Sequence, residues 1–433
     1  MEKEKLGKLL AFYLENGIID LDSLASNSKE ESMSNILNKV HKYKITTYTD
    51  GRYQTYVPDP TKPNGRRQVR KKSIEDMNEF LLEFYTLEIK AGDKNFGKLY
   101  EEWVNYKRQF CEVNNTHKGL SPSTIRRYER DYDNYLRGSK LSNQTITNIS
   151  SISLETLLGD LIEEHNISES SASNVIGYVR QAFAYAKRAG YVRENPCEYV
   201  DRRLVLSRCM PTIKKDDCDR VLTLNEMAAL KRSVLEHEER HPDYMPDYAI
   251  ELAMMTGMRV GEIAALRWRS VDDGYIHIDE AERRYDYSDR PSEIVIGEPK
   301  NQKHRLIPLT DEMRELFGRI QSLDMKSDED FIFVREDMSR YTGHDISCAA
   351  DRRAADAGIK KTSIHGIRRT VSSILRTKLP VKTVANMLGH LEETNEQHYN
   401  YDFFEDSAKI KALSELSSNV LKFPQKIERA EAR

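Results

Sequence analysis

The pattern of secondary structure changes character twice along this 433-residue chain, and this change constrains its fold more than any other feature. Residues 41–92 contain short alternating runs typical of strands, residues 93–201 contain only helical periodicity, and residues 221–433 combine both patterns. At roughly 150 residues per domain, a chain of this length is expected to form about three domains. The sequence therefore predicts a mainly α, multidomain protein with small β-sheets.

The segment 41–92 is predicted to be a three-stranded sheet followed by a helix. Two alternating runs flank Asp50-Gly51, a dipeptide that favours a tight hairpin. A third strand follows a turn that contains Pro and Gly, and Ser73 caps the helix after it. Residues 41–72 contain nine Lys or Arg residues against two Asp residues, a local net charge of +7. A basic sheet that also carries aromatic residues suits insertion into a DNA groove.

The region 93–201 is predicted to be helical throughout. Its two clearest helices have apolar side chains on one stripe and polar side chains on the opposite face, which by itself is the pattern of ordinary solvated helices. Residues 1–40 are also predicted to be helical, with no assigned role, and residues 202–220 form a polar, charged linker. Thr223 and Glu226 have the spacing of a capping box, which opens the largest domain.

Composition excludes several classes of protein. The five cysteines are scattered and include no Cys-x-x-Cys pair, which fits a reduced protein without a disulfide framework or structural zinc. No apolar run approaches the roughly 20 residues that a membrane-spanning helix needs. The net charge is only −3, but the positive charge is clustered, because residues 351–376 carry seven Lys or Arg residues against two Asp residues. Clustered positive charge is what phosphate binding requires.

The last domain contains a series of polar residues in motifs that point to phosphodiester chemistry. Arg259 follows Thr-Gly-Met at a predicted junction between two helices, and Lys300 lies in a predicted hairpin turn. His365 and Arg368 are one helical turn apart and therefore share a helix face. Each residue alone has an ordinary structural explanation, and only the ordered set is specific. In order, the set is Arg259, Lys300, His365, Arg368, His390 and Tyr399.

In its local contexts, this set resembles the tyrosine recombinase family, the lambda-type integrases. The matching motifs are Thr-Gly-x-Arg-x-x-Glu, Pro-Lys, His-x-x-Arg-Arg-Thr, and Leu-Gly-His followed by Tyr. The resemblance implies a site-specific recombinase that cuts and rejoins the DNA of a mobile element through a 3′-phosphotyrosyl intermediate, without a metal or cofactor. Tyr401 is a second candidate for the nucleophile, but the nine-residue distance from His390 favours Tyr399.

The resemblance also implies a role for each residue of the set. Tyr399 attacks phosphorus, and Arg259 and Arg368 bind the non-bridging oxygens. Lys300 protonates the departing 5′ oxygen, because lysine, unlike arginine, has a proton it can readily give up. His365 acts as the general base, and His390 donates a further hydrogen bond to the phosphate.

Further upstream, the resemblance implies two DNA-binding domains. Residues 41–92 look like the arm-site-binding domain of integrases from phages and conjugative elements of Gram-positive bacteria, and residues 93–201 look like the core-site-binding domain. The expected DNA contacts of the first are Arg52, Arg66, Arg67, Arg70 and Lys71, and those of the second are Arg126, Arg130, Asn174, Gln181 and Arg188. The expected partners are double-stranded attachment sites of core and arm type, bound by a homotetramer in the cytoplasm of a bacterial host. The family also admits an accessory DNA-bending or excision factor.

Two other functions compete with this interpretation. A type IB topoisomerase has a similar catalytic set, but DNA relaxation needs no separate arm-binding domain. His237, Glu238 and His241 match the His-Glu-x-x-His pattern of zinc proteases, and Glu262 offers a third ligand. The charged context and Pro242, which ends the helix, argue against a zinc site. A DNA-binding regulator on an inactive recombinase scaffold is a further alternative, and the complete catalytic set disfavours it.

Overall fold

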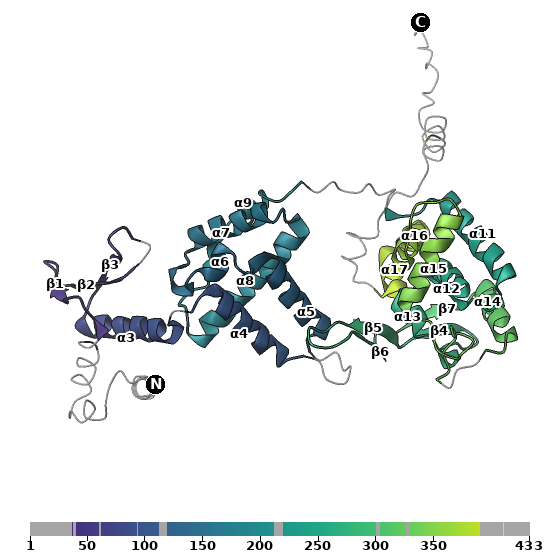
Figure 1. Ribbon diagram of the computed structural model, residues 1–433, viewed down its shortest axis with the longest axis horizontal. Coiled ribbons are helices and arrows are strands. Elements are labelled where there is room, and N and C mark those ends of the chain that lie inside the picture. Colours follow the sequence, from purple (N-terminus) through teal and green to yellow (C-terminus); the bar gives the residue numbers. More distant parts are fainter. Residues whose placement is uncertain are drawn as a thin grey trace, which may run out of the picture. The chain divides into compact units, whose positions relative to one another are not determined.

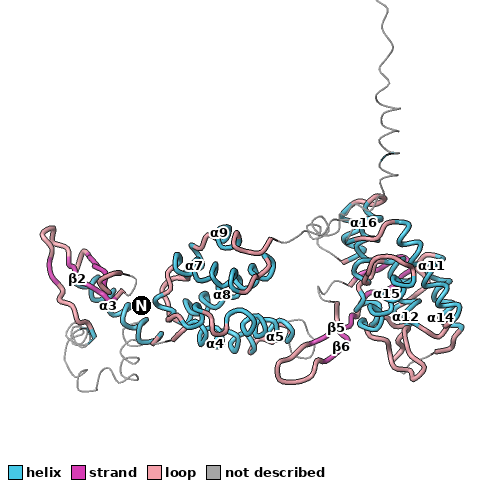
Figure 2. Tube along the Cα trace, turned by 45° about the horizontal axis from the view of Figure 1, so that its top comes forward, coloured by secondary structure: helices cyan, strands magenta, loops and turns pink. Residues whose placement is uncertain are grey.

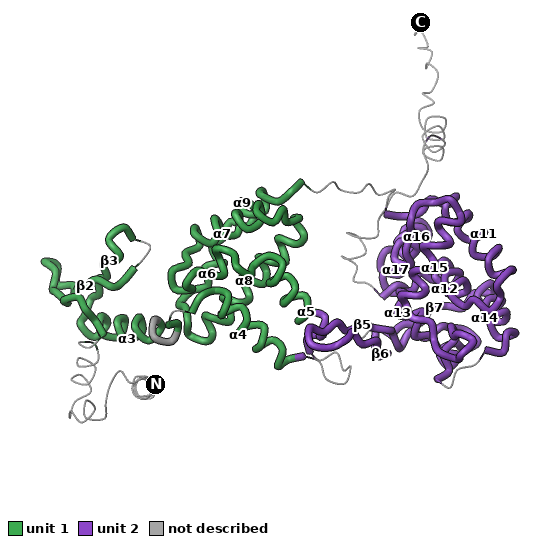
Figure 3. Tube along the Cα trace, in the orientation of Figure 1, with its two compact units in different colours: residues 1–110, 124–212 green, residues 111–123, 213–433 purple. Residues whose placement is uncertain are grey.

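The computed structural model divides the chain into two compact units, Met1–Phe110 with Thr124–Thr212, and Cys111–Ser123 with Ile213–Arg433 (Figure 3). Helices predominate in both units and strands are short (Figure 2), which confirms the predicted mainly α class with small sheets. Among the described residues, the structure contains no helix with the length and hydrophobicity of a membrane-spanning segment. The structure describes residues 37, 40–59, 62–92, 94–111, 119–211, 220–299, 304–325, 329–389 and 410.

The first unit begins with an antiparallel sheet in the order β1-β2-β3, followed by a helix (Figure 1). The elements are β1 (Thr46–Thr47), β2 (Tyr53–Pro58), β3 (Arg66–Lys71) and α3 (Ile74–Ala91). Gly51 adopts φ +82° in the turn between β1 and β2, a conformation that favours glycine. The Ser73 hydroxyl oxygen accepts a 3.0 Å hydrogen bond from the backbone N–H of Asp76 at the start of α3. The hairpin, the third strand and the capped helix are therefore confirmed.

One face of this sheet packs against α3, and the opposite face is open to solvent. Val57 of β2 and Val69 of β3 are buried together with Met77 and Leu81 of α3. Because side chains alternate along a strand, Arg66 and Arg70 must lie on the face opposite Val69.

The rest of the first unit is helical and has an aromatic core. Tyr100 stacks on Tyr132 with ring centroids 4.8 Å apart, and Trp103 lies 4.9 Å from Tyr128. Phe183 is also buried. The elements are α4 (Phe96–Arg108), α5 (Pro122–Asp131), the π-helical turn η2 (Tyr132–Leu136), α6 (Lys140–Asn143), η3 (Ile146–Asn148), α7 (Ser151–Glu164), α8 (Glu169–Ala189), η4 (Pro196–Tyr199) and α9 (Arg202–Leu206).

The second unit is built around helix α12, which packs against α11, α13, α14, α15 and α16. Nearly every residue of α12 is buried, polar ones included. Thr223 and Glu226 form the predicted capping box: the backbone N–H of Glu226 donates to the Thr223 hydroxyl, and the backbone N–H of Thr223 donates to the Glu226 carboxylate. The helices are α11 (Leu224–Arg240), α12 (Met245–Thr256), α13 (Val260–Ala264), η5 (Trp268–Ser270), α14 (Asp311–Ser322), α15 (Gly343–Asp356), α16 (Ile364–Arg376) and α17 (Val381–Leu388).

Two separate two-stranded sheets complete the second unit. Their strands are β4 (Tyr275–Ile278), β5 (Ala281–Tyr285), β6 (Glu293–Gly297) and β7 (Arg305–Pro308), with β4 paired to β7 and β5 paired to β6. The segment between β6 and β7 therefore joins strands of different sheets. The hairpin turn predicted around Lys300 is wrong, because both flanking strands find other partners; Lys300 itself lies outside the described residues.

Candidate active site

Arg259 lies at the junction where α12 ends and α13 begins, as the sequence predicts. Gly257 ends α12 with φ +65°, and the backbone N–H of Arg259 donates a 2.8 Å hydrogen bond to Glu262. Nη1 of Arg259 donates a second hydrogen bond of 2.9 Å to the same carboxylate. The Glu262 side chain is buried, whereas about a third of the Arg259 side chain is exposed. One edge of the guanidinium is thus fixed by Glu262, and the exposed part remains accessible to a ligand.

His365 and Arg368 both lie on α16, whose first turn is capped by Ser363. Arg368 is almost completely buried. Its Nη1 donates to the carbonyl oxygen of Gly257 at 2.7 Å, and its Nη2 donates to that of Leu388 at 2.6 Å. His365, one turn earlier, reaches solvent. The predicted shared face is therefore present, with the arginine at its base and the imidazole at its outer edge.

The surroundings of His365 keep its imidazole neutral. Desolvation lowers the pKa of His365 to about 4, assisted by the positive charges of Arg369, Arg368 and Arg259. A histidine with this pKa is uncharged near pH 7 and has a ring nitrogen that can accept a proton. The neutral form is the one that a general base needs, and a pKa of about 4 makes it a weaker base than an imidazole with an ordinary pKa.

Arg305 belongs to the same cluster, although it is not among the site residues predicted from the sequence. Its Nη1 and Nη2 donate to the two carboxylate oxygens of Glu262, at 2.9 and 2.6 Å. The alternation of side chains along β7 could have identified Arg305 from the sequence. Arg305 lies two positions before the buried Ile307 and therefore shares its face of the strand. A charged residue at an inward position of a strand requires a buried partner, and Glu262 is that partner.

Three arginines of this site meet at the end of α17, where they cap consecutive backbone carbonyls. We call this arrangement the arginine cap. Its hydrogen bonds run from Arg305 Nε to Met387 O (2.8 Å), from Arg368 Nη2 to Leu388 O (2.6 Å) and from Arg259 Nη2 to Gly389 O (2.8 Å). The last carbonyls of a helix lack partners within the helix and carry partial negative charge, so cations are favourable there.

The other predicted catalytic residues lie outside the described part of the chain, namely Lys300, His390 and Tyr399. Gly389, the neighbour of His390, is described and adopts φ +67° as the cap of α17. Of the six predicted catalytic residues, the structure therefore places Arg259, His365 and Arg368 in one site. The described segment ends there at Gly389, the residue before His390.

The structure separates the five basic residues predicted to bind DNA through the sheet. Arg66 lies over the ring of Tyr56 at 4.6 Å, and Arg70 lies over that of Tyr48 at 4.4 Å, on the open face. Lys71 is on the other face, where its ammonium group is 4.9 Å from the ring of Phe80 in α3.

The remaining two of the five are held by carboxylates. Arg67 follows Arg66 along β3 and therefore lies on the opposite face of the sheet, where its Nε is 3.7 Å from a carboxylate oxygen of Asp59. Arg52 bonds to Asp50 within the turn, at 2.8 Å. The five residues therefore do not form one surface, and the open face of the sheet carries Arg66 and Arg70.

The candidates in the helical part lie on two neighbouring helices, α5 and α8, which meet through the rings of Tyr128 and Tyr178 at 4.9 Å. On α5, Arg126 is half-buried and Arg130 is exposed. On α8, Asn174 and Arg188 are exposed and Gln181 is half-buried. Tyr185, also on α8, donates a 2.8 Å hydrogen bond to Glu102.

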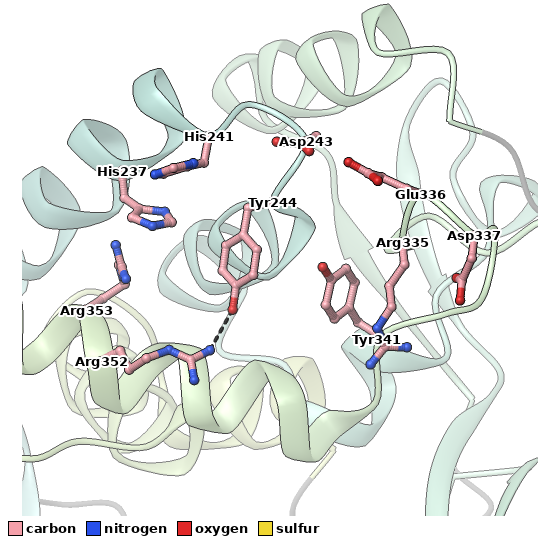
Figure 4. A pocket seen from close by; sticks show the side chains of 10 residues that line it. All are labelled: His237, His241, Asp243, Tyr244, Arg335, Glu336, Asp337, Tyr341, Arg352 and Arg353. Carbon is pink, nitrogen blue, oxygen red and sulfur yellow. Dashed lines mark hydrogen bonds between the residues drawn. The ribbon is translucent and has the colours of Figure 1, made fainter.

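The His-Glu-x-x-His motif forms part of a pocket lined by several cations. His237 and His241 lie side by side at the end of α11, with ring centroids 4.5 Å apart. Arg353 faces His237, and Arg352 donates a 2.7 Å hydrogen bond to the hydroxyl of Tyr244 (Figure 4). His237 Nδ1 is hydrogen-bonded to Asp247 at 2.5 Å. Glu238 binds Arg319, and Glu262 binds Arg259 and Arg305. Among the described residues, no three His, Cys, Asp or Glu side chains are placed to hold a metal ion.

Comparisons with known proteins agree with the predicted resemblance. Residues 220–405 match the phage integrase family, and residues 108–190 match the N-terminal SAM-like domain of phage integrases. A XerC-like tyrosine recombinase of Caldanaerobacter subterraneus is 24% identical over 331 residues, which cover 70% of this chain and 78% of the relative. The XerD recombinase of Oceanobacillus iheyensis is 23% identical over 296 residues, covering 66% of this chain and 89% of the relative.

Solved integrase structures share the fold. The Tn1549 transposon integrase in complex with a circular intermediate DNA superposes with a TM-score of 0.56 at 18% identity, covering 74% of this chain and 99% of the other. A lambda integrase dimer bound to a COC′ core site gives 0.52 at 15% identity, with 83% and 94% covered. A lambda integrase tetramer bound to a Holliday junction gives 0.51 at 16% identity, with 83% and 95% covered. The comparisons support neither the topoisomerase nor the zinc protease alternative.

Proposed function

Because this chain belongs to the tyrosine recombinase family, we propose that it is a site-specific DNA recombinase that uses Tyr399 as its nucleophile. The observation that supports this proposal most directly is the arrangement of Arg259, Arg368 and His365. They come from two separate parts of the second unit, yet Arg259 and Arg368 bind adjacent carbonyls at the end of α17. Both guanidiniums also contribute to lowering the pKa of His365, which lies close to them.

This arrangement suits phosphoryl transfer from DNA to a tyrosine. In the proposed reaction, the Tyr399 oxygen forms a bond to phosphorus while the bond from phosphorus to the 5′ oxygen breaks. Tyrosine has a reference pKa near 10, so its proton must leave during the attack, and the neutral His365 is the proposed acceptor. Lys300 is the proposed donor of the proton that the 5′ oxygen needs. His390 is proposed as a further hydrogen-bond donor to the phosphate.

The guanidiniums are proposed to stabilise the transition state. Charge grows on the non-bridging oxygens as the tyrosine attacks, and fixed cations close to them lower the barrier without reorganisation. The partly exposed Arg259 is proposed to contact these oxygens, whereas Arg368, which is 1% exposed and has both Nη atoms bonded to carbonyls, is proposed to act through its charge. Arg259 is oriented by Glu262 before DNA arrives, so its geometry is already set. Together with Lys300, Arg259 and Arg368 are proposed to supply the positive charge that a divalent metal provides in metal-dependent nucleases. We therefore expect cleavage to proceed in excess EDTA at a rate within a small factor of the untreated reaction.

We extend the proposal to the DNA partners and to the division of the chain. Residues 93–201 are proposed to bind core sites, residues 41–92 arm sites, and residues 221–433 to carry out strand exchange. The predicted linker, residues 202–220, begins with helix α9, which packs against α7 and α8, so the linker is proposed to start only after this helix. By analogy with the lambda integrase tetramer on a Holliday junction, the active complex is proposed to be a homotetramer on two duplexes. Within the sheet, Arg66 and Arg70 are the proposed arm-site contacts, since they occupy its open face.

A suicide-substrate assay tests this function. Duplexes that the full-length protein selects from a random-sequence library would be nicked near the cleavage position, so that the released strand diffuses away and the covalent complex accumulates. The expected product is protein attached to a 3′ phosphate, formed equally well with and without EDTA. Loss of the product on chelation and its recovery with zinc would favour a metalloenzyme. Absence of any covalent product with all selected duplexes would contradict the proposed function.

A further inference from the structure

The Arg305 guanidinium donates more hydrogen bonds within the site than the Arg259 guanidinium does, and it is less accessible. Its side chain is 6% exposed, compared with 33% for Arg259. All three of its guanidinium nitrogens donate: Nε to Met387 O, and Nη1 and Nη2 to Glu262. Because these bonds direct the guanidinium into the protein, Arg305 is not placed to bind a DNA phosphate. Any role in the reaction must therefore act through the groups it holds.

Glu262 is the first of these groups, and it connects Arg305 to Arg259. The carboxylate accepts four hydrogen bonds, two from Arg305, one from the Arg259 guanidinium and one from the Arg259 backbone N–H. A carboxylate has about four lone-pair positions, so its accepting capacity is filled. Losing Arg305 would leave the buried Glu262 with half of its partners, and Glu262 is the group that orients the Arg259 side chain.

The end of α17 is the second group that Arg305 holds. Gly389 is packed tightly there, because a Cβ atom at this position would lie 3.1 Å from Nη1 of Arg305 and 3.4 Å from Nη1 of Arg259. The chain continues from Gly389 to His390 and, nine residues later, to Tyr399. The arginine cap thus fixes the point from which the proposed nucleophile's segment begins.

We propose that Arg305 is a positioning residue for the cleavage reaction. By binding Glu262 it holds the Arg259 guanidinium in place, and by binding the Met387 carbonyl it holds the end of α17 in place. This inference rests on the proposed recombinase function. It assigns Arg305 no contact with DNA. It predicts that cleavage, more than DNA binding, depends on Arg305.

The first experiment compares Arg305→Met with Arg353→Met in the full-length protein. Arg353 is a matched control, because its side chain is 8% exposed, it pairs with Asp356 at 3.2 Å, and it lies on α15 outside the arginine cap. Both substitutions remove a buried cation, so both are expected to lower the melting temperature. Only Arg305→Met is expected to slow formation of the covalent complex, by roughly a hundredfold, since small misplacements of reacting groups cost about that much. Affinity for a selected core-site duplex should change little in either variant.

The pH dependence of cleavage provides a readout that a purely structural role would not change. Burial raises the pKa of Glu262, but the hydrogen bonds and charge of Arg305, followed by the charges of Arg259 and Arg368, outweigh burial and lower it to about 2. Without Arg305 this pKa rises, so the carboxylate is protonated, and Arg259 released, at a higher pH. In the wild-type protein His365, with the higher pKa of about 4, sets the acid limb of single-turnover cleavage. In Arg305→Met the limb should move to higher pH, because protonation of Glu262 then contributes to it. It should stay near its wild-type position in Arg305→Lys, which keeps the charge.

A double variant identifies the titrating group. In Arg305→Met combined with Glu262→Gln, no carboxyl group remains at this position, so the displaced acid limb should disappear. The inference is overturned if Arg305→Met lowers stability but cleaves at the wild-type rate with the wild-type pH profile, as Arg353→Met is expected to do. A wild-type protein that forms no covalent complex would instead contradict the recombinase function, so the two failures are distinguishable.

Discussion

Nη2 of Arg259 donates a 2.8 Å hydrogen bond to the backbone carbonyl oxygen of Gly389. This bond joins the first catalytic motif of the sequence to the last, because Gly389 directly precedes His390. The guanidinium that we propose to bind the scissile phosphate therefore also holds the segment that leads to Tyr399. A change at either end of this bond is expected to affect both phosphate binding and presentation of the nucleophile.

Tyr399→Phe is expected to bind core-site DNA with wild-type affinity and to form no covalent complex. The change removes one hydroxyl group and no charge, so the Lys and Arg contacts that dominate DNA affinity are preserved. Binding would be measured by a mobility shift and covalent attachment by denaturing electrophoresis of a suicide-substrate reaction. Tyr401→Phe is the matched control and should react normally. The opposite result, with Tyr399→Phe reactive and Tyr401→Phe inert, would assign the nucleophile to Tyr401.

Cleavage is expected to show no acid limb from His365 near pH 6.5. The folded-state pKa of His365 is about 4, below its ordinary value, so the neutral imidazole persists above that pH and is lost as pH falls through it. The second-order rate constant for covalent complex formation reports the pKa values of the free protein. Titration of His365 should therefore not change this rate constant between pH 8 and about pH 5. An apparent pKa near 6.5 that disappears in His365→Gln would contradict this expectation.

The two faces of the sheet are expected to respond differently to loss of charge. Arg66→Ala with Arg70→Ala should weaken arm-site binding and reduce its salt dependence, with the slope falling by about one for each phosphate that is no longer neutralised. Arg67→Ala with Lys71→Ala removes the same charge from the face that carries Val69 and should have a smaller effect. Binding of the full-length protein to a selected arm-site duplex at several salt concentrations measures both. Equal losses of affinity for the two pairs would show that the open face is not the binding surface.

Lys300→Ala is expected to be slow on ordinary DNA and close to wild type on DNA whose bridging 5′ oxygen is replaced by sulfur. Loss of a general acid typically costs on the order of a hundredfold to ten-thousandfold in rate. A thiolate, with a reference pKa near 8.5, leaves without being protonated, so the sulfur substrate removes the need for the acid.

The control for this test is Arg259→Ala, which should remain slow on both substrates, because its proposed contacts are with the non-bridging oxygens. Equal defects of Lys300→Ala on both substrates would mean that Lys300 only positions the DNA. The acid would then be sought first at Lys303 and next at His304, whose Nδ1 is 2.9 Å from an oxygen of Asp279.

Features that depend on residues close together in the chain could be predicted from the sequence. The hairpin at Asp50-Gly51, the caps at Ser73 and Thr223, and the placement of His365 and Arg368 on one helix all follow from local rules of backbone conformation and periodicity. The ordered catalytic motifs could be recognised for the same reason, since each is a short stretch with its own context. These local rules do not predict which distant segments of the chain pack against each other.

The tertiary structure alone decided how these pieces are joined. Arg305 contacts Glu262 and Met387, which are 43 and 82 positions away, and no local pattern relates three such residues. The pairing of β7 with β4 is likewise set by long-range burial of apolar faces. The physical reason is that a local sequence sets backbone preferences and face polarity, whereas a buried charge acquires its partner only when distant segments are packed against each other.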